Sequence, residues 1–328
     1  MINSIEVKNL GPVKEWKADF RELNIFIGPN GSGKSYVNMV LYSMLQVANR
    51  KNNGDDIKQK LQFVFQEKDV KNLITWKERE AKVLIQMDEG ELSLELYKQK
   101  EPILKNNINK KIPIDEINFV SMPDVLNVYS AINIFTQEHP GSLGVSETIT
   151  DFLTRILNLE YPEKAKNWKN LLKKIENKIN ARFSVEKGKI TASFKREKLN
   201  IERVASGLKT FSLIYLALKQ GIITPGGILF LEEPEEHLHP EWQVIMAEVL
   251  VDMALNGVQI FVSTHSDYLL KKINNLLQKD SNLKDKVKAY LFTTDGFPKE
   301  LEIDVRGIDL LPLLETFYKL YEEEQELL

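Results

Sequence analysis

An eight-residue segment of the sequence, GPNGSGKS, combines residue types that bind nucleotide phosphates. It matches the pattern GxxxxGK[ST], in which glycines let backbone N–H groups curve around phosphate oxygens. Lys34 would reach the β- and γ-phosphates, and the hydroxyl of Ser35 would bind Mg²⁺. The positive end of a following helix would strengthen the attraction for anions. The predicted nucleotide-binding residues here are Gly28, Pro29, Asn30, Gly31, Ser32, Gly33, Lys34, Ser35 and Tyr36.

Two adjacent carboxylates, Glu232 and Glu233, follow an apolar run at residues 228–231. Successive side chains on a strand point to opposite faces, so the two carboxylates cannot do the same work. Glu232 would bind Mg²⁺, directly or through water, and Glu233 would orient the attacking water or accept its proton. The alternative interpretation is an acidic cap at the end of the strand.

A single histidine, His265, ends a second apolar run at residues 260–264. Neighbouring parallel strands present their functional side chains at the same edge of the sheet. We therefore expect His265 to lie near Lys34 and Glu233 and to hydrogen-bond the γ-phosphate or the attacking water. A purely structural histidine is the alternative.

Two further motifs have a plain and a functional interpretation. His237 and His239 stand among carboxylates, but no third ligand follows at the right spacing, and Pro240 is typical of a first helical residue. We interpret this segment as a loop next to the γ-phosphate. Ser206 and Gly207 precede an amphipathic helix, which is either an ordinary capped start or also an anion site.

The candidate residues lie at the ends of short apolar runs that are separated by helical patterns. This alternation predicts a buried parallel sheet of the α/β class, whose strands would position them. Strands and helices alternate on both sides of a long middle segment. The expected strands are 2–7, 23–27, 227–233 and 259–265, the expected helices are 36–49, 207–220, 240–255 and 267–277, a hairpin is expected from 287–292 and 302–305, and an acidic helix is expected at the end.

The middle segment, residues 51–202, has a weaker pattern and is expected to be an insertion. It contains alternating runs at 82–87 and 92–97 and a connector rich in Pro and Asn at 101–114. Residues 160–200 carry twelve Lys and Arg against five Asp and Glu, and a basic amphipathic helix is predicted at 164–179. This helix would either contact duplex DNA through its lysines or present a solvated face.

The composition excludes several kinds of site. The 328 residues include no cysteine, which rules out disulfides, thiolate metal sites and a cysteine nucleophile, and fits a reducing compartment. The formal net charge is −3, so any contact with DNA must come from a local basic patch. No run approaches the 18 apolar residues of a membrane span. We expect a soluble, cytoplasmic protein without a membrane partner.

The motifs GPNGSGKS, ASGLKT, ILFLEEPEEHLHP and STHS, in this order, resemble the Walker A, signature, Walker B with D-loop, and H-loop motifs of ABC-type ATPases. The soluble SMC, RecF and OLD-like branch is the most similar, and VKNLGPVKEWKADFRELNIFIGPNGSGKS resembles OLD-type ATPases, many of which serve anti-phage systems such as Septu and PARIS. The resemblance implies an α/β P-loop NTPase head of ABC/SMC type with a mixed sheet. It implies an ATPase core of residues 1–50 and 203–328 and an inserted, mainly helical lobe at 51–202.

In that family two heads enclose two ATP molecules, with Mg as the metal cofactor. The resemblance implies that Ser206 and Gly207 meet the γ-phosphate held by Lys34 of a partner head, and that residues 236–239 cross the dimer seam. It also implies a homodimer or higher homo-oligomer and a separate effector protein, a nuclease or toxin, with DNA as a further candidate partner. We expect no Toprim nuclease, because only about 60 residues follow His265 and they lack a spread of catalytic carboxylates on several strands.

The sequence departs from the transporter pattern in three places. The signature is SGLKT in place of SGGQ, Glu232 stands where Asp is common, and the Q-loop glutamine has only Gln62, Gln66 and Gln86 as candidates. The leading hypothesis is a Mg-dependent ATPase whose ATP-driven dimerisation controls an effector or senses DNA in anti-phage defence. The alternatives are a RecF- or SMC-like DNA-repair ATPase and an ATP-binding scaffold with little turnover. A transporter subunit fits poorly.

Overall fold

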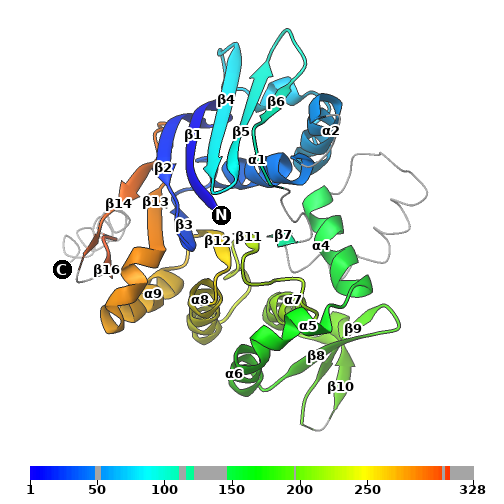
Figure 1. Ribbon diagram of the computed structural model, residues 1–328. Helices are drawn as coiled ribbons and strands as arrows, with labels where there is room; N and C mark the ends of the chain where they lie inside the picture. Colours follow the sequence, from blue (N-terminus) through cyan, green and yellow to red (C-terminus); the bar gives the residue numbers. More distant parts are fainter. Residues whose placement is uncertain (49–52, 111–115, 122–145, 196, 305–306, 311–328) are drawn as a thin grey trace, which may run out of the picture.

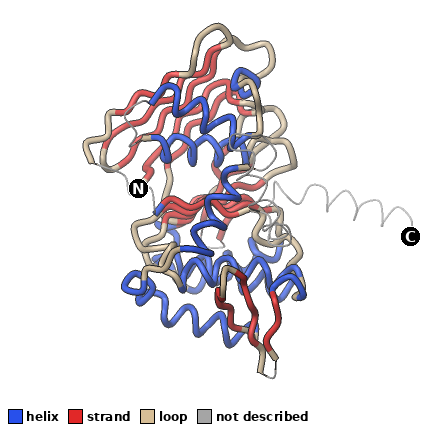
Figure 2. The backbone as a smooth tube through the Cα atoms, turned by 90° about the vertical axis from the view of Figure 1, so that its right-hand side faces the viewer, coloured by secondary structure: helices blue, strands red, loops and turns tan. Residues whose placement is uncertain are grey.

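The fold is layered, with an antiparallel sheet above a central mixed sheet and helices on either side of the central sheet (Figures 1 and 2). The computed structural model describes residues 1–328 except 49–52, 111–115, 122–145, 196, 305–306 and 311–328. The acidic helix expected at the end of the chain lies outside the described residues. The expected α/β class with a mixed sheet is confirmed.

The central sheet has six strands in the order β14-β13-β3-β12-β11-β7. Neighbouring strands from β13 to β7 are parallel, and β14 is antiparallel to β13. Every residue of β3 and β12 is buried, as expected for strands covered on both faces. The strands are β3 (Leu23–Ile27), β7 (Ile117–Val120), β11 (Ile228–Glu232), β12 (Gln259–Thr264), β13 (Val287–Leu291) and β14 (Lys299–Leu301).

Alternate side chains of the central strands enter two separate cores. Ile25 of β3 packs in the core that includes α7, α8 and α9, whereas Phe26 packs in the core that includes α1. Within the described residues no helix is both long and apolar enough to cross a membrane. The main helices are α1 (Lys34–Val47), α2 (Asn53–Phe65), α4 (Glu147–Asn158), α7 (Ser206–Lys219), α8 (Pro240–Leu255) and α9 (Asp267–Lys279).

The upper sheet is antiparallel, in the order β2-β1-β4-β5-β6 (Figure 1). Its strands are β1 (Ile2–Leu10), β2 (Val13–Asp19), β4 (Glu80–Met87), β5 (Gly90–Tyr97) and β6 (Ile103–Asn106). The sequence predicted two opening strands, and β2 is the one that it missed. Two charged residues separate buried Val13 from buried Trp16, which breaks the alternation that marks a strand.

Residues 51–202, expected as a mainly helical insertion, supply seven of the described strands, β4 to β10. β4 pairs with β1 in the upper sheet, and β7 pairs with β11 in the central sheet. The expected boundary at residue 50 therefore separates strands that are hydrogen-bonded to each other. A small sheet of β8 (Arg182–Glu186), β9 (Lys189–Ser193) and β10 (Lys198–Asn200) lies below α7 (Figure 1).

The hairpin expected around Asp295 and Gly296 is present, but its second strand differs. β14 at Lys299–Leu301 pairs with β13. The expected partner at 302–305 contains β15 (Ile303–Asp304), but β15 pairs with β16 (Gly307–Ile308) and not with β13. Asp295 accepts a hydrogen bond from the Phe297 backbone N–H at 3.0 Å, which closes the turn early. Pairing can therefore begin at Lys299.

The predicted basic helix at 164–179 is divided into three pieces: α5 (Pro162–Ala165), a 3₁₀ turn and α6 (Lys169–Ile179). Trp168 is buried at the division, and its indole N–H donates to the Ile223 carbonyl at 2.7 Å. Two lysines of α6 form ion pairs with carboxylates of α8, Lys174 with Asp252 and Lys178 with Glu248. Half of the four lysines expected to contact DNA (Lys169, Lys173, Lys174 and Lys178) are therefore neutralised within the protein.

Glu248 joins three helices, because Lys178 of α6 and Lys272 of α9 lie 2.7 and 2.8 Å from its carboxylate. Burial tends to raise the pKa of Glu248, but the hydrogen bonds from the two lysines outweigh burial and lower it to about 2. After allowance for solvent screening, we expect Glu248→Gln to lower the free energy of unfolding by about 1–2 kcal/mol at pH 7.

This contribution should be complete above the unfolded-state pKa of about 4.5 and should disappear as the pH falls toward about 2. Urea unfolding of wild type and Glu248→Gln between pH 2 and 7 measures it. Glu160→Gln, at an exposed glutamate, is the matched control. A difference that stays constant down to pH 2 would exclude the ion pairs as its cause.

Candidate nucleotide site

The loop between β3 and α1 has the backbone that a phosphate-binding loop requires. Three of its glycines have positive φ, at 141° for Gly28, 77° for Gly31 and 104° for Gly33, where other residues are strained. A Cβ atom on Gly28 would also lie 2.0 Å from the Phe292 carbonyl oxygen. α1 begins at Lys34, two residues before the expected start at residue 36, so the positive end of the helix faces this loop.

Lys34 is held within the loop, and only 5% of its surface is exposed. Its ammonium donates to the carbonyl oxygens of Gly28 and Pro29 at 2.7 and 3.0 Å. Burial lowers the pKa of Lys34 below its usual value, although the carboxylates of Glu233, Glu232 and Glu235 oppose this shift. The loop therefore carries a desolvated ammonium within electrostatic reach of those carboxylates.

The structure brings Ser35 and Glu232 together, as the sequence predicted for a magnesium site. Burial raises the pKa of Glu232 to about 7, although a hydrogen bond with the Ser35 side chain opposes the rise. Within the described residues, Glu232 Oε1 and the hydroxyl of Ser263, its partner on β12, are buried without a hydrogen-bond partner. Burying a polar atom without a hydrogen-bond partner costs folding free energy, unless a bound ligand supplies the missing partner. A hydroxyl and a carboxylate are ligands that Mg²⁺ prefers.

The hydroxyl of Ser32 is another buried polar atom without a partner, and it indicates a ligand in the phosphate loop. Ser32 lies in the loop with no exposed surface, and its Oγ has no hydrogen-bond partner among the described residues. Its backbone N–H donates to the Pro29 carbonyl at 3.3 Å, which tightens the loop. The residues present thus fit both a phosphate chain and a divalent cation.

Glu233 and His265 form the pair that the sequence expected at this edge. His265 Nε2 lies 3.4 Å from Glu233 Oε1. Glu233 has a φ of 45°, unusual for a non-glycine residue, and its backbone N–H donates to the Ser263 carbonyl at 3.0 Å. Burial and the ammonium of Lys34 lower the pKa of His265, while Glu233 opposes them. The imidazole is therefore neutral at pH 7 and can accept or donate a hydrogen bond.

The structure adds Glu235, which the sequence analysis did not assign. One carboxylate oxygen of Glu235 accepts from the Thr264 hydroxyl at 2.7 Å and from the His265 backbone N–H at 2.6 Å. Burial raises the pKa of this carboxyl. Glu235 thereby fixes the end of β12 against the loop that follows β11. Its position in the run EEPEE was the only signal available in the sequence.

A cleft of about 370 Å³ opens beside the Glu233 and His265 pair. Its wall also includes Ser266, whose Oγ accepts from the Leu269 backbone N–H at 2.9 Å and caps α9. The lining residues are Glu233, Glu235, Glu236, Gln243, His265, Ser266, Asp267 and Tyr268. The cleft is acidic, so it suits a water molecule that must lose a proton better than it suits a second anion.

The segment after the carboxylates begins a helix, as expected. His239 precedes α8, its Nδ1 accepts from the Glu241 backbone N–H at 3.5 Å, and Pro240 is the first helical residue. His239 is thus a helix cap. Ser206 and Gly207 begin α7, and a Cβ on Gly207 would lie 3.0 Å from the His237 carbonyl oxygen. These contacts place the predicted signature against the 237–242 segment of the same chain.

The three glutamines considered for a Q-loop lie outside the central sheet. Gln62 of α2 donates to the Lys68 carbonyl at 2.6 Å, Gln66 to the Phe63 carbonyl at 2.7 Å, and Gln86 of β4 to Glu91 at 2.6 Å. Their hydrogen bonds stabilise the α2 end and the β4–β5 hairpin. The structure therefore assigns none of them to the nucleotide site.

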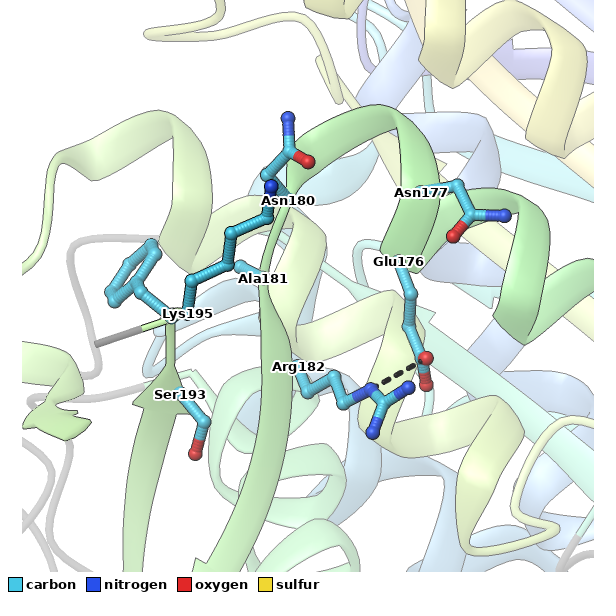
Figure 3. A pocket seen from close by; sticks show the side chains of 8 residues that line it. Glu176, Asn177, Asn180, Ala181, Arg182, Ser193 and Lys195 are labelled. Atoms are coloured by element: carbon cyan, nitrogen blue, oxygen red, sulfur yellow. Dashed lines mark hydrogen bonds and ion pairs between the residues drawn. The ribbon is translucent and has the colours of Figure 1, made fainter. Parts of the chain in front are cut away.

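A second pocket, of about 330 Å³, lies between α6 and the small sheet (Figure 3). Its acidic residue, Glu176, is engaged at both oxygens, by Arg182 Nε at 2.7 Å and by the Tyr215 hydroxyl at 2.6 Å. Figure 3 shows the Arg182 side chain directed at this carboxylate. Through these two contacts Glu176 joins α6 to β8 and α7, and we assign it a structural role.

Comparisons with known proteins agree with this geometry. A family model described as "AAA domain, putative AbiEii toxin, Type IV TA system" matches residues 95–271, more than half of the chain. A second model, described as "AAA ATPase domain", matches residues 1–139. No match was found among curated proteins.

Solved structures of SMC heads have the same fold. An SMC head bound to the C-winged helix domain of ScpA is 16% identical, with 92% of this chain and 96% of that chain covered and a TM-score of 0.54. The SMC head domain from Thermotoga maritima is 14% identical, with 93% and 99% covered and a TM-score of 0.50. The fold is that of an SMC-type P-loop ATPase head, as the sequence predicted.

Proposed function

We propose, because the chain belongs to the AbiEii AAA-domain family matched above, that it is a Mg²⁺-dependent ATPase whose heads pair on ATP and separate after hydrolysis. One observation carries this proposal. The phosphate loop with Lys34, the Ser35 and Glu232 contact, and the Glu233 and His265 pair all meet at the carboxyl edge of the central sheet. An ATPase needs these three parts together.

In the proposed reaction, the backbone N–H groups of the loop and the start of α1 bind the phosphates. The ammonium of Lys34 neutralises the charge that develops on the β- and γ-phosphate oxygens. Ser35 and Glu232 would hold Mg²⁺, which when bound supplies a Lewis acid for the phosphate oxygens. Each of these contributions favours the transition state because the charge is greatest there.

Glu233 orients the attacking water and accepts its proton, and the cleft next to it has room for that water. His265 is a positioning residue for Glu233 because its Nε2 lies 3.4 Å from the carboxylate. Glu235 in turn holds the backbone of His265 through a bond of 2.6 Å. Glu233 and His265 are thereby held at the ends of two adjacent strands, β11 and β12.

The signature completes the site from a second copy of the chain. Ser206 and Gly207 at the start of α7 would meet the γ-phosphate bound to a partner head, with residues 236–239 at the seam. Support comes from the sequence resemblance, and from Gly207 packing against His237, which joins these two parts of the seam. The assembly would be a homodimer or a higher homo-oligomer.

The biological role that we propose is control of a separate effector, a nuclease or toxin, in anti-phage defence. Two observations favour this role: the resemblance to OLD-type ATPases and the toxin–antitoxin description of the family model. A DNA-repair role is less favoured, because Lys174 and Lys178 are paired with α8. The proposed setting is the cytoplasm.

Light scattering combined with phosphate release tests the ATPase proposal. We expect Mg·ATP to raise the solution mass of the wild-type protein to at least twice that of the monomer and to yield phosphate, with ADP failing to hold the larger form. Lys34→Ala should remain at the starting mass, because it removes the ammonium that holds the phosphates. Absence of both ATP binding and phosphate release in the wild type would refute the proposal.

A further inference from the structure

Trp76 is the most exposed large apolar side chain of the described residues, with 84% of its surface open to solvent. Trp16 and Trp168, in contrast, are buried at 3% and 0%. An exposed indole offers a large flat apolar surface together with a polar N–H group, which suits it to contact a ligand. The position of Trp76 in the fold indicates the kind of ligand that it would contact.

Trp76 stands at the corner of a tight turn. The Glu78 backbone N–H donates to the Thr75 carbonyl at 3.0 Å, and Lys77 has a φ of 71°, so Trp76 and Lys77 are the two central residues. Thr75 is fixed in turn, because its N–H donates to the Asn9 carbonyl at 2.9 Å and its hydroxyl to the Gly11 carbonyl at 2.7 Å. The indole is therefore presented by a rigid support.

That support rests on the phosphate loop. Gly11, in the turn between β1 and β2, lies so close to the Tyr36 ring that an added Cβ would be 2.4 Å from it. The side chain of Val13, the first residue of β2 after this turn, would lie 2.7 Å from a Cβ on Gly33. The β1–β2 turn thus contacts the residues on both sides of Lys34 and Ser35. The segment that carries Trp76 and the phosphate loop therefore both contact this turn.

A second exposed aromatic residue, Phe297, also lies beside the β1–β2 turn, and 43% of its surface is exposed. The Lys14 ammonium already lies 5.4 Å from the centre of the Phe297 ring. For Trp76, no ring contact or overlying lysine is found among the residues that the structure describes. The two faces of the indole are therefore the free aromatic surface beside the loop.

We propose that Trp76 stacks on the purine base of the nucleotide whose phosphates lie in the loop of residues 28–35, an inference that rests on the proposed nucleotide site. With the phosphates held at Lys34, the ribose and the base would lie beyond the loop, on the side of the β1–β2 turn. An indole offers a large, stiff π surface, and stacking on an aromatic side chain is a major source of affinity for bases. Because every base has a π face, the contact would raise affinity for purine nucleotides without selecting one purine.

Calorimetric titrations with Mg·ATP and with inorganic tripolyphosphate, which lacks a base, test the stacking. We expect Trp76→Ala to weaken ATP binding about fivefold or more and to leave tripolyphosphate binding unchanged within about twofold. Trp76→Phe should retain most of the ATP affinity. Phe297→Ala is the matched control, an exposed aromatic residue beside the same turn, and should bind both ligands as the wild type does.

Indole fluorescence gives an independent reading. ATP should quench the emission of the wild type but not of Trp76→Ala, and tripolyphosphate should quench neither. Unchanged ATP affinity in Trp76→Ala, or a base-dependent loss confined to Phe297→Ala, would overturn the stacking and leave the ATPase proposal intact. If the wild type binds neither ATP nor tripolyphosphate, the proposed nucleotide site fails, and the stacking fails with it.

Discussion

Lys34→Ala is expected to weaken ATP binding by at least about a hundredfold and to remove hydrolysis. The Lys34 ammonium, which the loop holds with only 5% exposure, is a charged donor that water replaces poorly. Its loss removes charge-assisted bonds to the phosphates, each worth about 1.5–3 kcal/mol. Calorimetric titration with Mg·ATP and a phosphate-release assay measure both effects.

The variant must be compared with a lysine change that leaves the loop intact. Lys17→Ala removes an exposed ammonium from β2, where Lys17 pairs with Glu6 at 3.0 Å, and should bind ATP as the wild type does. The thermal midpoint of Lys34→Ala also needs recording, because this ammonium holds the Gly28 and Pro29 carbonyls. A folded variant that binds ATP with wild-type affinity would rule out the assigned phosphate site.

The local parts of the site could be predicted because their signals are contiguous in the sequence. GPNGSGKS contains its own turn glycines, its cation and the first residues of its helix, and the structure has the loop and α1 in the expected places. α8 likewise begins at Pro240, as predicted, because proline favours the first helical position. Such features depend on a few neighbouring residues and little on the rest of the fold.

Features that depend on distant contacts could not be predicted in the same way. The bond of Glu235 to Thr264 joins positions 29 apart in sequence, and β7 pairs with β11, more than a hundred residues further along the chain. In a regular strand, the side chains of Glu232 and Glu233 would point to opposite faces. Glu233 lies just beyond the end of β11 and has a φ of 45°, so strand geometry does not set the direction of its side chain. No sequence pattern indicates a positive φ at a glutamate.

The basic character of residues 160–200 shows why charge counts mislead without a fold. Lys174 and Lys178 count toward a DNA-binding excess, yet both face carboxylates of α8. Those carboxylates lie about 75 residues further along the chain, outside any local window. A charge excess predicts a binding surface only where the charges remain unpaired.

Glu233→Gln should separate ATP binding from hydrolysis. The amide keeps the size of the carboxylate but cannot accept the proton of the attacking water, so we expect hydrolysis to fall by at least about a hundredfold. ATP affinity should stay within about threefold, because Lys34, Ser35 and Glu232 are unchanged. With hydrolysis blocked, the ATP-bound assembly should persist in light scattering after the wild type has returned to its starting mass.

Asp267→Asn is the matched control, because Asp267, in the first turn of α9, is a carboxylate that lines the same cleft. It should retain near-normal turnover. The histidine titration, followed by NMR, tests the contact itself: Glu233 raises the pKa of His265, so its replacement by glutamine should lower that pKa further. Turnover near wild type in Glu233→Gln would remove Glu233 from the base role. Equal losses in the two variants would mean that the acidity of the cleft as a whole is needed, and that the pairing with His265 adds nothing specific.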